Sequence, residues 1–262
     1  MTMRRIALVI EYDGTNYVGW QVQPNGVSIQ EKIDDAFEML IGERPVLHGS
    51  GRTDSGVHAR AQTAHIDTES RIPADKVCYA LNTRLPDDIR IKASFEAPLS
   101  FHARFDVKEK HYVYRINNGP HASAFGGRTE LHVHYPLDLG RLNECAELFM
   151  GTHDFNGFRA AGSKAASTER TIYASRWVKQ GDRLYYHVAG SGFLYNMVRI
   201  MVGTMIRVGQ GFDEPDIIAA ALADPRRVNA GDTAPAHGLT LWRVKYDLFD
   251  TEDFAEPSPV IL

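Results

Sequence analysis

The chain has 262 residues, 44% of them hydrophobic, and a formal net charge of −4, so it can bury a sizeable core and is not globally disordered. Its two cysteines, Cys78 and Cys145, form no CxxC pair, which indicates a reducing compartment and argues against structural zinc. No apolar run reaches the ~18 residues that a membrane span needs, and the first residues become charged too early for a signal peptide. We therefore expect a cytoplasmic protein without a membrane partner.

The charge is unevenly distributed along the second half of the chain. Residues 159–207 contain eight Lys or Arg and two Asp or Glu, a local charge of +6. Residues 208–262 contain four Lys or Arg and ten Asp or Glu, a local charge of −6. Two differently charged solvated surfaces would explain this pattern, and so would a basic groove for a polyanion with acidic surface kept away from it.

The first hundred residues predict six helices and strands. Residues 4–12 are short, apolar and β-branched, which indicates a buried strand. Ser28 with Glu31 forms a capping box, so a helix begins there. In chain order we expect a strand at 4–12, a helix from 28, a short strand at 44–50, a strand at 61–67, a helix from 73 and a strand at 88–97. The order is β-α-β-β-α-β.

The order recurs in the rest of the chain. Asp138 is placed to cap a helix, and Gly181 lies at the turn of a hairpin. The expected elements are a strand at 110–118, a helix from 138, a hairpin turning at 180–182, a long helix at 192–208, a short helix at 216–223 and a strand at 239–249. The predicted fold class is α+β, with two ferredoxin-like βαββαβ halves that carry antiparallel sheets. We expect domains at 1–104 and 105–262.

A glycine-rich stretch, HGSGRTDSGVHAR (His48 to Arg60), carries a single carboxylate, Asp54, among bases. Its glycines allow tight turns and close ligand approach. An ionised Asp54 could act as nucleophile, base or metal ligand, or it could simply cap its own turn. Arg52 could keep Asp54 ionised or hold a phosphate.

Two further segments carry candidate side chains. In KEKHYVYRI, Tyr112 and Tyr114 share one face of the predicted strand, where an aromatic ring can stack on a base or simply fill the core. In GSGFLYNMVRIMVG, Arg199 interrupts an apolar helix pattern. Its charge either reaches water at the helix edge or points into a site.

The sequence gives no support for a metal site or a glycosidase site. The histidines at 58, 65, 132 and 134 fit no HExxH or similar ligand pattern, and core or surface histidines explain them better. A glycosidase needs a second carboxylate near the first, and the loop offers only Asp54.

Taken together, the segments resemble the tRNA pseudouridine synthase A family. The motifs that carry the resemblance occur in the family's order from the first strand to the last: EYDGTNYVGWQVQ, GSGRTDSGVHA, FHARF, KHYVYRI, GSGFLYNMVRIMVG and TAPAHGLTL. The GRTDxGVHA element is the most specific of them. Ser55 deviates inside this motif without changing the expected chemical groups.

The resemblance implies the pseudouridine synthase fold, in which the two halves join around a central catalytic cleft. It implies an isomerase that converts uridine to pseudouridine at positions 38, 39 and 40 of the tRNA anticodon stem-loop, acting as a homodimer on tRNA and not on DNA, with no metal and no organic cofactor. Asp54 would be the nucleophile and Tyr112 would stack on the flipped base. Arg52 would fill the vacated space or hold phosphate, and Arg199 would orient Asp54.

Two other hypotheses remain open at this point. A non-catalytic RNA-binding protein on the same scaffold would keep the basic groove and the aromatic rings without needing Asp54. A metal-dependent nuclease or hydrolase would use Asp54 with nearby histidines.

Overall fold

A computed structural model describes residues 2–162 and 165–254, and these form two compact units. Unit 1 comprises residues 2–108 and 241–254, and unit 2 comprises residues 109–240. Unit 2 is thus one continuous stretch of the chain, inserted between the two parts of unit 1. The contacts group residues 241–254 with unit 1, whereas the sequence pattern groups them with the second half. The rest of the expected second domain, 255–262, lies outside the described residues, as do 163–164 of the basic segment.

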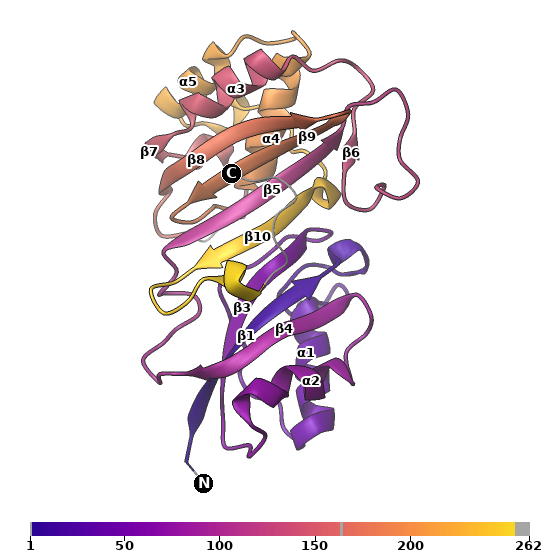
Figure 1. Ribbon diagram of the computed structural model, residues 1–262. Coiled ribbons are helices and arrows are strands. Elements are labelled where there is room, and N and C mark those ends of the chain that lie inside the picture. The colour runs from indigo at the N-terminus through magenta and orange to yellow at the C-terminus, as the bar shows by residue number, and fades with distance from the viewer. Residues whose placement is uncertain (1, 163–164, 255–262) are drawn as a thin grey trace. The chain divides into compact units, whose positions relative to one another are not determined.

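The sheet of unit 1 is antiparallel along the pairs described and is built around β1 (Arg4–Tyr12). The strand order is β4-β1-β3-β10, with β3 at His58–Thr68, β4 at Ile89–Ala97 and β10 at Leu239–Lys245 (Figure 1). The short β2 (His48–Gly49) also pairs with β3, antiparallel, and leads directly into the glycine-rich stretch. β1 has a paired strand on both sides, and its residues 6–10 are completely buried, so both faces of the sheet are covered at this strand.

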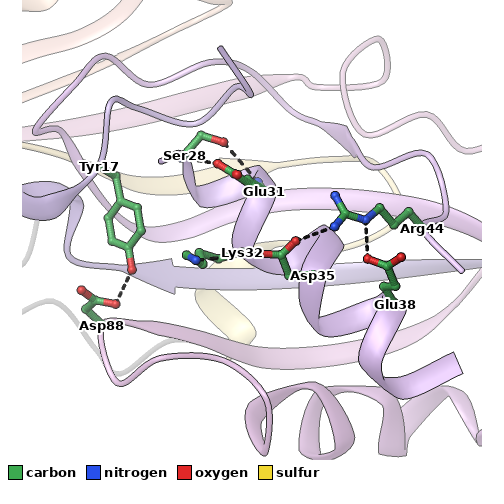
Figure 2. A network of polar contacts seen from close by, with 8 residues as sticks. All are labelled: Tyr17, Ser28, Glu31, Lys32, Asp35, Glu38, Arg44 and Asp88. Carbon is green, nitrogen blue, oxygen red and sulfur yellow. Dashed lines mark hydrogen bonds and ion pairs between the residues drawn. The ribbon is translucent and has the colours of Figure 1, made fainter. Parts of the chain in front are cut away.

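The first helix of unit 1 begins where local capping chemistry predicts. At the start of α1 (Ile29–Ile41), the Ser28 side chain accepts the Glu31 N–H at 3.1 Å and the Glu31 carboxylate accepts the Ser28 N–H at 3.3 Å, which confirms the capping box (Figure 2). The helix ends at Gly42, whose φ of 78° is left-handed. Beyond it, Arg44 reaches back to carboxylates of the last turns, as Figure 2 shows. The second helix, α2 (Val77–Asn82), packs against β4.

Unit 2 repeats the arrangement with additions. Its sheet has the order β5-β9-β8-β7, with β5 at Glu109–Asn117, β7 at Gly151–Asp154, β8 at Glu169–Gln180 and β9 at Arg183–Gly190. The short β6 (Leu131–His132) runs parallel to β5. In Figure 1, α3 (Leu139–Leu148) and α4 (Met197–Gly209) lie on the same side of this sheet, with α5 (Asp216–Ala223) beside them. Asp138 caps α3 by accepting the Arg141 N–H at 3.1 Å, as predicted.

The α+β class and the repeated β-α-β-β-α-β order are confirmed, with β6, β7 and α5 as additions in the second half. Within 2–162 and 165–254, no helix combines the length and the apolar character that crossing a membrane requires.

Several boundaries differ from the sequence prediction. The helix expected from Pro73 starts as a 3₁₀ turn at Ala74–Lys76 and becomes α-helical only at Val77, and the strand expected at 61–67 already begins at His58. The long helix begins at Met197 and not at Gly192, because Asn196 has a φ of 59° and interrupts the helical backbone. The last strand ends at Lys245, because the Tyr246 N–H turns back to the Phe249 carbonyl at 2.9 Å. The strand expected at 44–50 is reduced to β2.

Candidate functional site

The loop that carries Asp54 connects β2 to β3 and closes in a tight turn. The Val57 N–H donates to the Asp54 carbonyl at 3.1 Å, and Gly56, the third residue of the turn, has a φ of 77°. That geometry is a type II turn, which favours glycine at this position. Asp54 is half-buried and Arg52 is exposed, so both side chains can be reached from solvent.

On one side, the strand β3 holds the start of the loop through a buried amide. The Gln62 side chain donates to the Gly51 carbonyl at 2.9 Å and accepts from the Ser50 hydroxyl at 2.6 Å. The Ser50 N–H donates to the Thr63 carbonyl at 2.7 Å. Since Gln62 is completely buried, its amide cannot exchange these partners for water without cost.

On the other side, residues 12–20 hold Thr53, the residue before Asp54. The Trp20 N–H donates to the Thr53 carbonyl at 3.1 Å, and the Tyr12 hydroxyl is 2.7 Å from the Thr53 hydroxyl. Gly19 has a φ of 108°, and a Cβ there would lie 2.6 Å from the Thr53 carbonyl oxygen. Only glycine allows this close approach of the two backbones.

The end of the loop is anchored by His58, which is buried. Its Nδ1 accepts the Gly14 N–H at 3.0 Å and lies 3.1 Å from an Asp13 carboxylate oxygen. A Cβ on Gly14 would come within 2.1 Å of the Val57 carbonyl oxygen. The backbone on both sides of Asp54 is therefore fixed by buried contacts from two segments, 12–20 and 62–63.

In unit 2, Tyr112 lies on the face of β5 that is covered by helices. It pairs across the sheet with Val188, while Tyr114 pairs with Tyr186 on the same face, as the alternation predicts. The Tyr112 side chain is 8% exposed, and its ring meets the Phe193 ring edge-on at 5.2 Å. Its ring therefore packs within unit 2 and leaves little of its surface open.

Arg199 lies in the first turn of α4 and binds groups of its own unit. Its Nε donates to the Ala234 carbonyl at 2.7 Å, and its Nη1 donates to the Asn196 side-chain oxygen at 2.8 Å. The Ala234 N–H returns a bond to the Arg199 carbonyl at 3.0 Å. Further along α4, a Cβ on Gly203 would lie 1.9 Å from the Asp232 carbonyl oxygen, so the helix and residues 232–234 are in direct contact.

The predicted site residues thus occur as one pair in each unit. Arg52 and Asp54 lie in one loop of unit 1. Tyr112 and Arg199 lie in unit 2, where both neighbour Tyr114. Burial raises the pKa of Tyr114, and the Arg199 guanidinium acts in the opposite direction.

A comparison with protein-family models matches residues 8–106 and 145–247 to the tRNA pseudouridine synthase model. A tRNA pseudouridine synthase A of Brevibacillus brevis is 47% identical over 93% of this chain and 100% of its own length. The enzymes of that name from Ruminiclostridium cellulolyticum and Acetivibrio thermocellus are 48% and 46% identical over the same share of this chain. This chain belongs to the tRNA pseudouridine synthase family.

Among solved structures, a chain of a Cbf5-Nop10-Gar1 complex matches at 10% identity with a TM-score of 0.37. The match covers 95% of this chain and 50% of that chain.

Two of the histidines weighed as metal ligands bind backbone groups of the fold. His65 Nδ1 accepts the Ala103 N–H at 3.1 Å, and His132 Nε2 is 3.0 Å from the Gly119 carbonyl. Burial lowers the pKa of His65 to about 4. Within the part of the chain that the structure describes, no three His, Cys, Asp or Glu side chains are grouped to hold a metal ion. The metal-dependent hypothesis therefore finds no ligand set there.

Sequence reasoning missed the groups that hold the Asp54 loop, chiefly Gln62, Trp20 and Tyr12. One signal was available for Gln62, since an amide inside the run AQTAHID must find polar partners when the strand is buried. For Trp20 and Tyr12 the sequence offers no comparable signal, because their partners lie more than thirty residues away.

Proposed function

We propose that this protein isomerises uridine to pseudouridine in tRNA and that Asp54 is its nucleophile. Family membership supports the isomerase activity. The assignment of Asp54 rests on one observation: the backbone on both sides of this half-buried carboxylate is held by buried contacts, through Gln62, Trp20 and His58. A nucleophile must be held in place before the substrate arrives, and this loop is built to do so.

The reaction suits a carboxylate nucleophile. The bond between N1 of uracil and C1′ of ribose breaks, the base rotates, and C5 forms a new bond to C1′ while its proton is lost and N1 gains one. The conversion is redox-neutral, so it requires neither a hydride carrier nor an electron donor. A stacked base is out of reach, so the nucleotide must first leave the stack. Asp54 then attacks C1′, attacks C6, or takes part in a glycal route.

The family resemblance suggests roles for the remaining candidates. Tyr112 would lie against the flipped base and assist proton removal at C5. Arg52, exposed two residues before the nucleophile, would fill the space left by the base or hold a phosphate. Arg199 would orient the Asp54 carboxylate, and its own orientation depends on Ala234 and Asn196.

The finer parts of the proposal come from the family resemblance. We propose that the substrates are uridines 38, 39 and 40 of the tRNA anticodon stem-loop, that the protein is a cytoplasmic homodimer, and that it uses no cofactor. The basic residues of 159–207 would contact the tRNA backbone with a salt-dependent contribution. Mass spectrometry of the product tRNA identifies the modified positions, and sedimentation analysis gives the oligomeric state.

The test is Asp54→Asn, which removes the charge and keeps the shape. With an unmodified tRNA transcript carrying tritium at uracil C5, we expect tritium release to fall at least about 10³-fold, with tRNA binding largely intact. Asp87→Asn is the matched control, since it removes a carboxylate that is fully exposed and paired with Arg90, and it should release tritium like the wild type.

Full release by Asp54→Asn would overturn the assignment of Asp54 as the nucleophile. A wild type that binds tRNA without releasing tritium would overturn the enzyme itself and leave an RNA-binding protein.

A further inference from the structure

A second group of aromatic and cationic side chains lies in unit 1, outside the Asp54 loop. We call it the Phe105 platform; it comprises His48, His102, Arg104 and Phe105. Phe105 is 74% exposed, and its ring centroid is 4.2 Å from that of His102. The Arg104 guanidinium carbon lies 5.9 Å from the centre of the Phe105 ring, and the exposed His48 ring lies 5.3 Å from His102. Most of a large apolar ring is thus exposed beside cationic or polar neighbours.

The backbone beneath the platform is held by buried groups. His65 Nδ1 accepts the Ala103 N–H at 3.1 Å, and the Tyr246 hydroxyl donates to the Ala103 carbonyl at 2.6 Å. The Arg5 guanidinium donates to the carbonyls of Leu99 and Phe101 at 2.6 and 2.5 Å. The segment therefore has four fixed backbone groups just before Phe105.

A local turn fixes Phe105 itself. The N–H groups of Phe105 and Asp106 donate to the His102 carbonyl at 3.2 and 3.0 Å. The Asp106 carboxylate accepts the His102 N–H at 2.7 Å, and the Arg104 N–H donates to His102 Nδ1 at 3.1 Å. The backbone that carries the exposed ring is held in place before anything binds, so a ligand stacking on the ring would have to order only the Phe105 side-chain torsions.

The charges around the platform decide what kind of ligand it suits. The Arg5 guanidinium is paired with the Asp67 carboxylate at 2.7 Å, and Asp106 lies two residues from Arg104. Burial lowers the pKa of His65 to about 4 and also lowers the pKa of His102. At neutral pH the positive charges of Arg5 and Arg104 are balanced by the negative charges of Asp67 and Asp106. The surface therefore offers one phosphate contact, through Arg104, and no strong electrostatic potential. Such a surface suits a flat aromatic group better than a run of duplex phosphates.

We propose that the Phe105 platform binds one unpaired nucleotide of the tRNA substrate, other than the uridine that reacts. The base stacks on the exposed Phe105 ring, and Arg104 contacts the adjoining phosphate. The inference rests on the proposed function for the identity of the RNA, while the stacking chemistry rests on the contacts described above.

The test is tRNA affinity at several salt concentrations, measured with the full chain and an unmodified tRNA transcript. Phe105→Ala should raise the Kd about tenfold at every salt concentration and leave the salt slope unchanged, since loss of one base–aromatic stack is worth roughly 1–3 kcal/mol. Arg104→Ala should flatten the slope of log Kd against log salt by about 0.7, which is one phosphate on single-stranded RNA. Phe105→Tyr keeps the ring and should restore the wild-type Kd.

Three controls keep the outcomes separate. Phe125→Ala removes a fully exposed ring in unit 2 and should not alter the Kd, so equal weakening by both Ala variants would overturn the platform. Phe105→Leu keeps apolar bulk without a stacking face, and full affinity in that variant would also overturn it. Dissociation of the Phe105→Ala protein into smaller species would also overturn the platform, because it would mean that this surface binds a second copy of the chain and not a nucleotide. Tritium release by the wild type is measured on the same transcript. Absence of release would contradict the proposed isomerase, whereas the ratios of variant to wild-type Kd test the platform alone.

Discussion

The Asp54 loop in unit 1 and Arg199 in unit 2 are held by different kinds of contact. In the loop, the fixed atoms are backbone groups of Ser50, Gly51 and Thr53, bound by neighbouring segments. Around Arg199, the side chain itself is bound, by the Ala234 carbonyl and the Asn196 side chain, in addition to the backbone bond from the Ala234 N–H. Exchanging the Asp54 side chain for an isostere therefore leaves these backbone bonds of the loop in place. Replacing Arg199 removes structural bonds along with any role in orienting Asp54, so loss of activity in an Arg199 variant alone is not diagnostic.

The largest effect should come from breaking the backbone support of the loop. Gly19→Ala adds a Cβ 2.6 Å from the Thr53 carbonyl oxygen at a φ of 108°. Steric strain and overpacking together should cost about 3 kcal/mol of unfolding free energy, with a fall in activity because Thr53 and Asp54 must shift. Urea denaturation and tritium release measure the two effects.

Gly42→Ala is the matched control for Gly19→Ala. Gly42 has a φ of 78° but has nothing within 4 Å of a new Cβ, so only the backbone preference is lost, about 1 kcal/mol, with activity unchanged. Equal losses of stability and activity in both variants would mean that contact with Thr53 does not support the loop.

An intermediate effect should come from acid, in both units. Burial lowers the pKa of His65 in unit 1 and of His187 in unit 2 to about 4, from an ordinary value of 6.5. The unfolded chain therefore takes up protons first, and stability is complete above about pH 6.5 and is lost as the pH falls toward 4. Each histidine should cost about 2 kcal/mol of unfolding free energy between pH 7 and pH 5.

Urea denaturation at the two pH values checks this, with His65→Asn as the informative variant. The Asn side-chain oxygen can replace Nδ1 as acceptor for the Ala103 N–H but does not titrate. The variant should be less stable than the wild type at pH 7 and should lose less on acidification. A pH dependence identical to that of the wild type would remove His65 as a source of acid sensitivity.

The smallest effect should come from single hydroxyls, one in each unit. Tyr12→Phe removes the contact with the Thr53 hydroxyl at 2.7 Å, and Tyr114→Phe removes the bond to the Pro235 carbonyl at 2.8 Å. Each should lower the free energy of unfolding by about 1 kcal/mol. A loss above about 3 kcal/mol in either variant would show that the hydroxyl supports more than one bond. Thermal denaturation of the two variants side by side is sufficient.

The sequence predicted those features whose cause is local. Ser28 with Glu31, Asp138 and Gly181 each lie within a few residues of the groups they satisfy, and the structure confirms the two helix starts and the hairpin turn. The start of α4 was wrong by five residues, since the left-handed Asn196 has no preference strong enough to be read from one sequence. The motifs identified the Asp54 loop as the candidate site, but what fixes it is contact between segments far apart in the chain.

Unit 2 is inserted between two parts of unit 1, and this has a consequence for biosynthesis. When the ribosome has made residue 108, unit 1 still lacks its strand β10 and the Phe249 and Phe254 rings that pack against Phe95. Unit 2 is complete once residue 240 has left the exit tunnel. Unit 1 is thus the first unit to be synthesised and the last to be completed. Until β10 is made, the edge of β3 that β10 covers stays accessible to chaperones or to aggregation while unit 2 is synthesised.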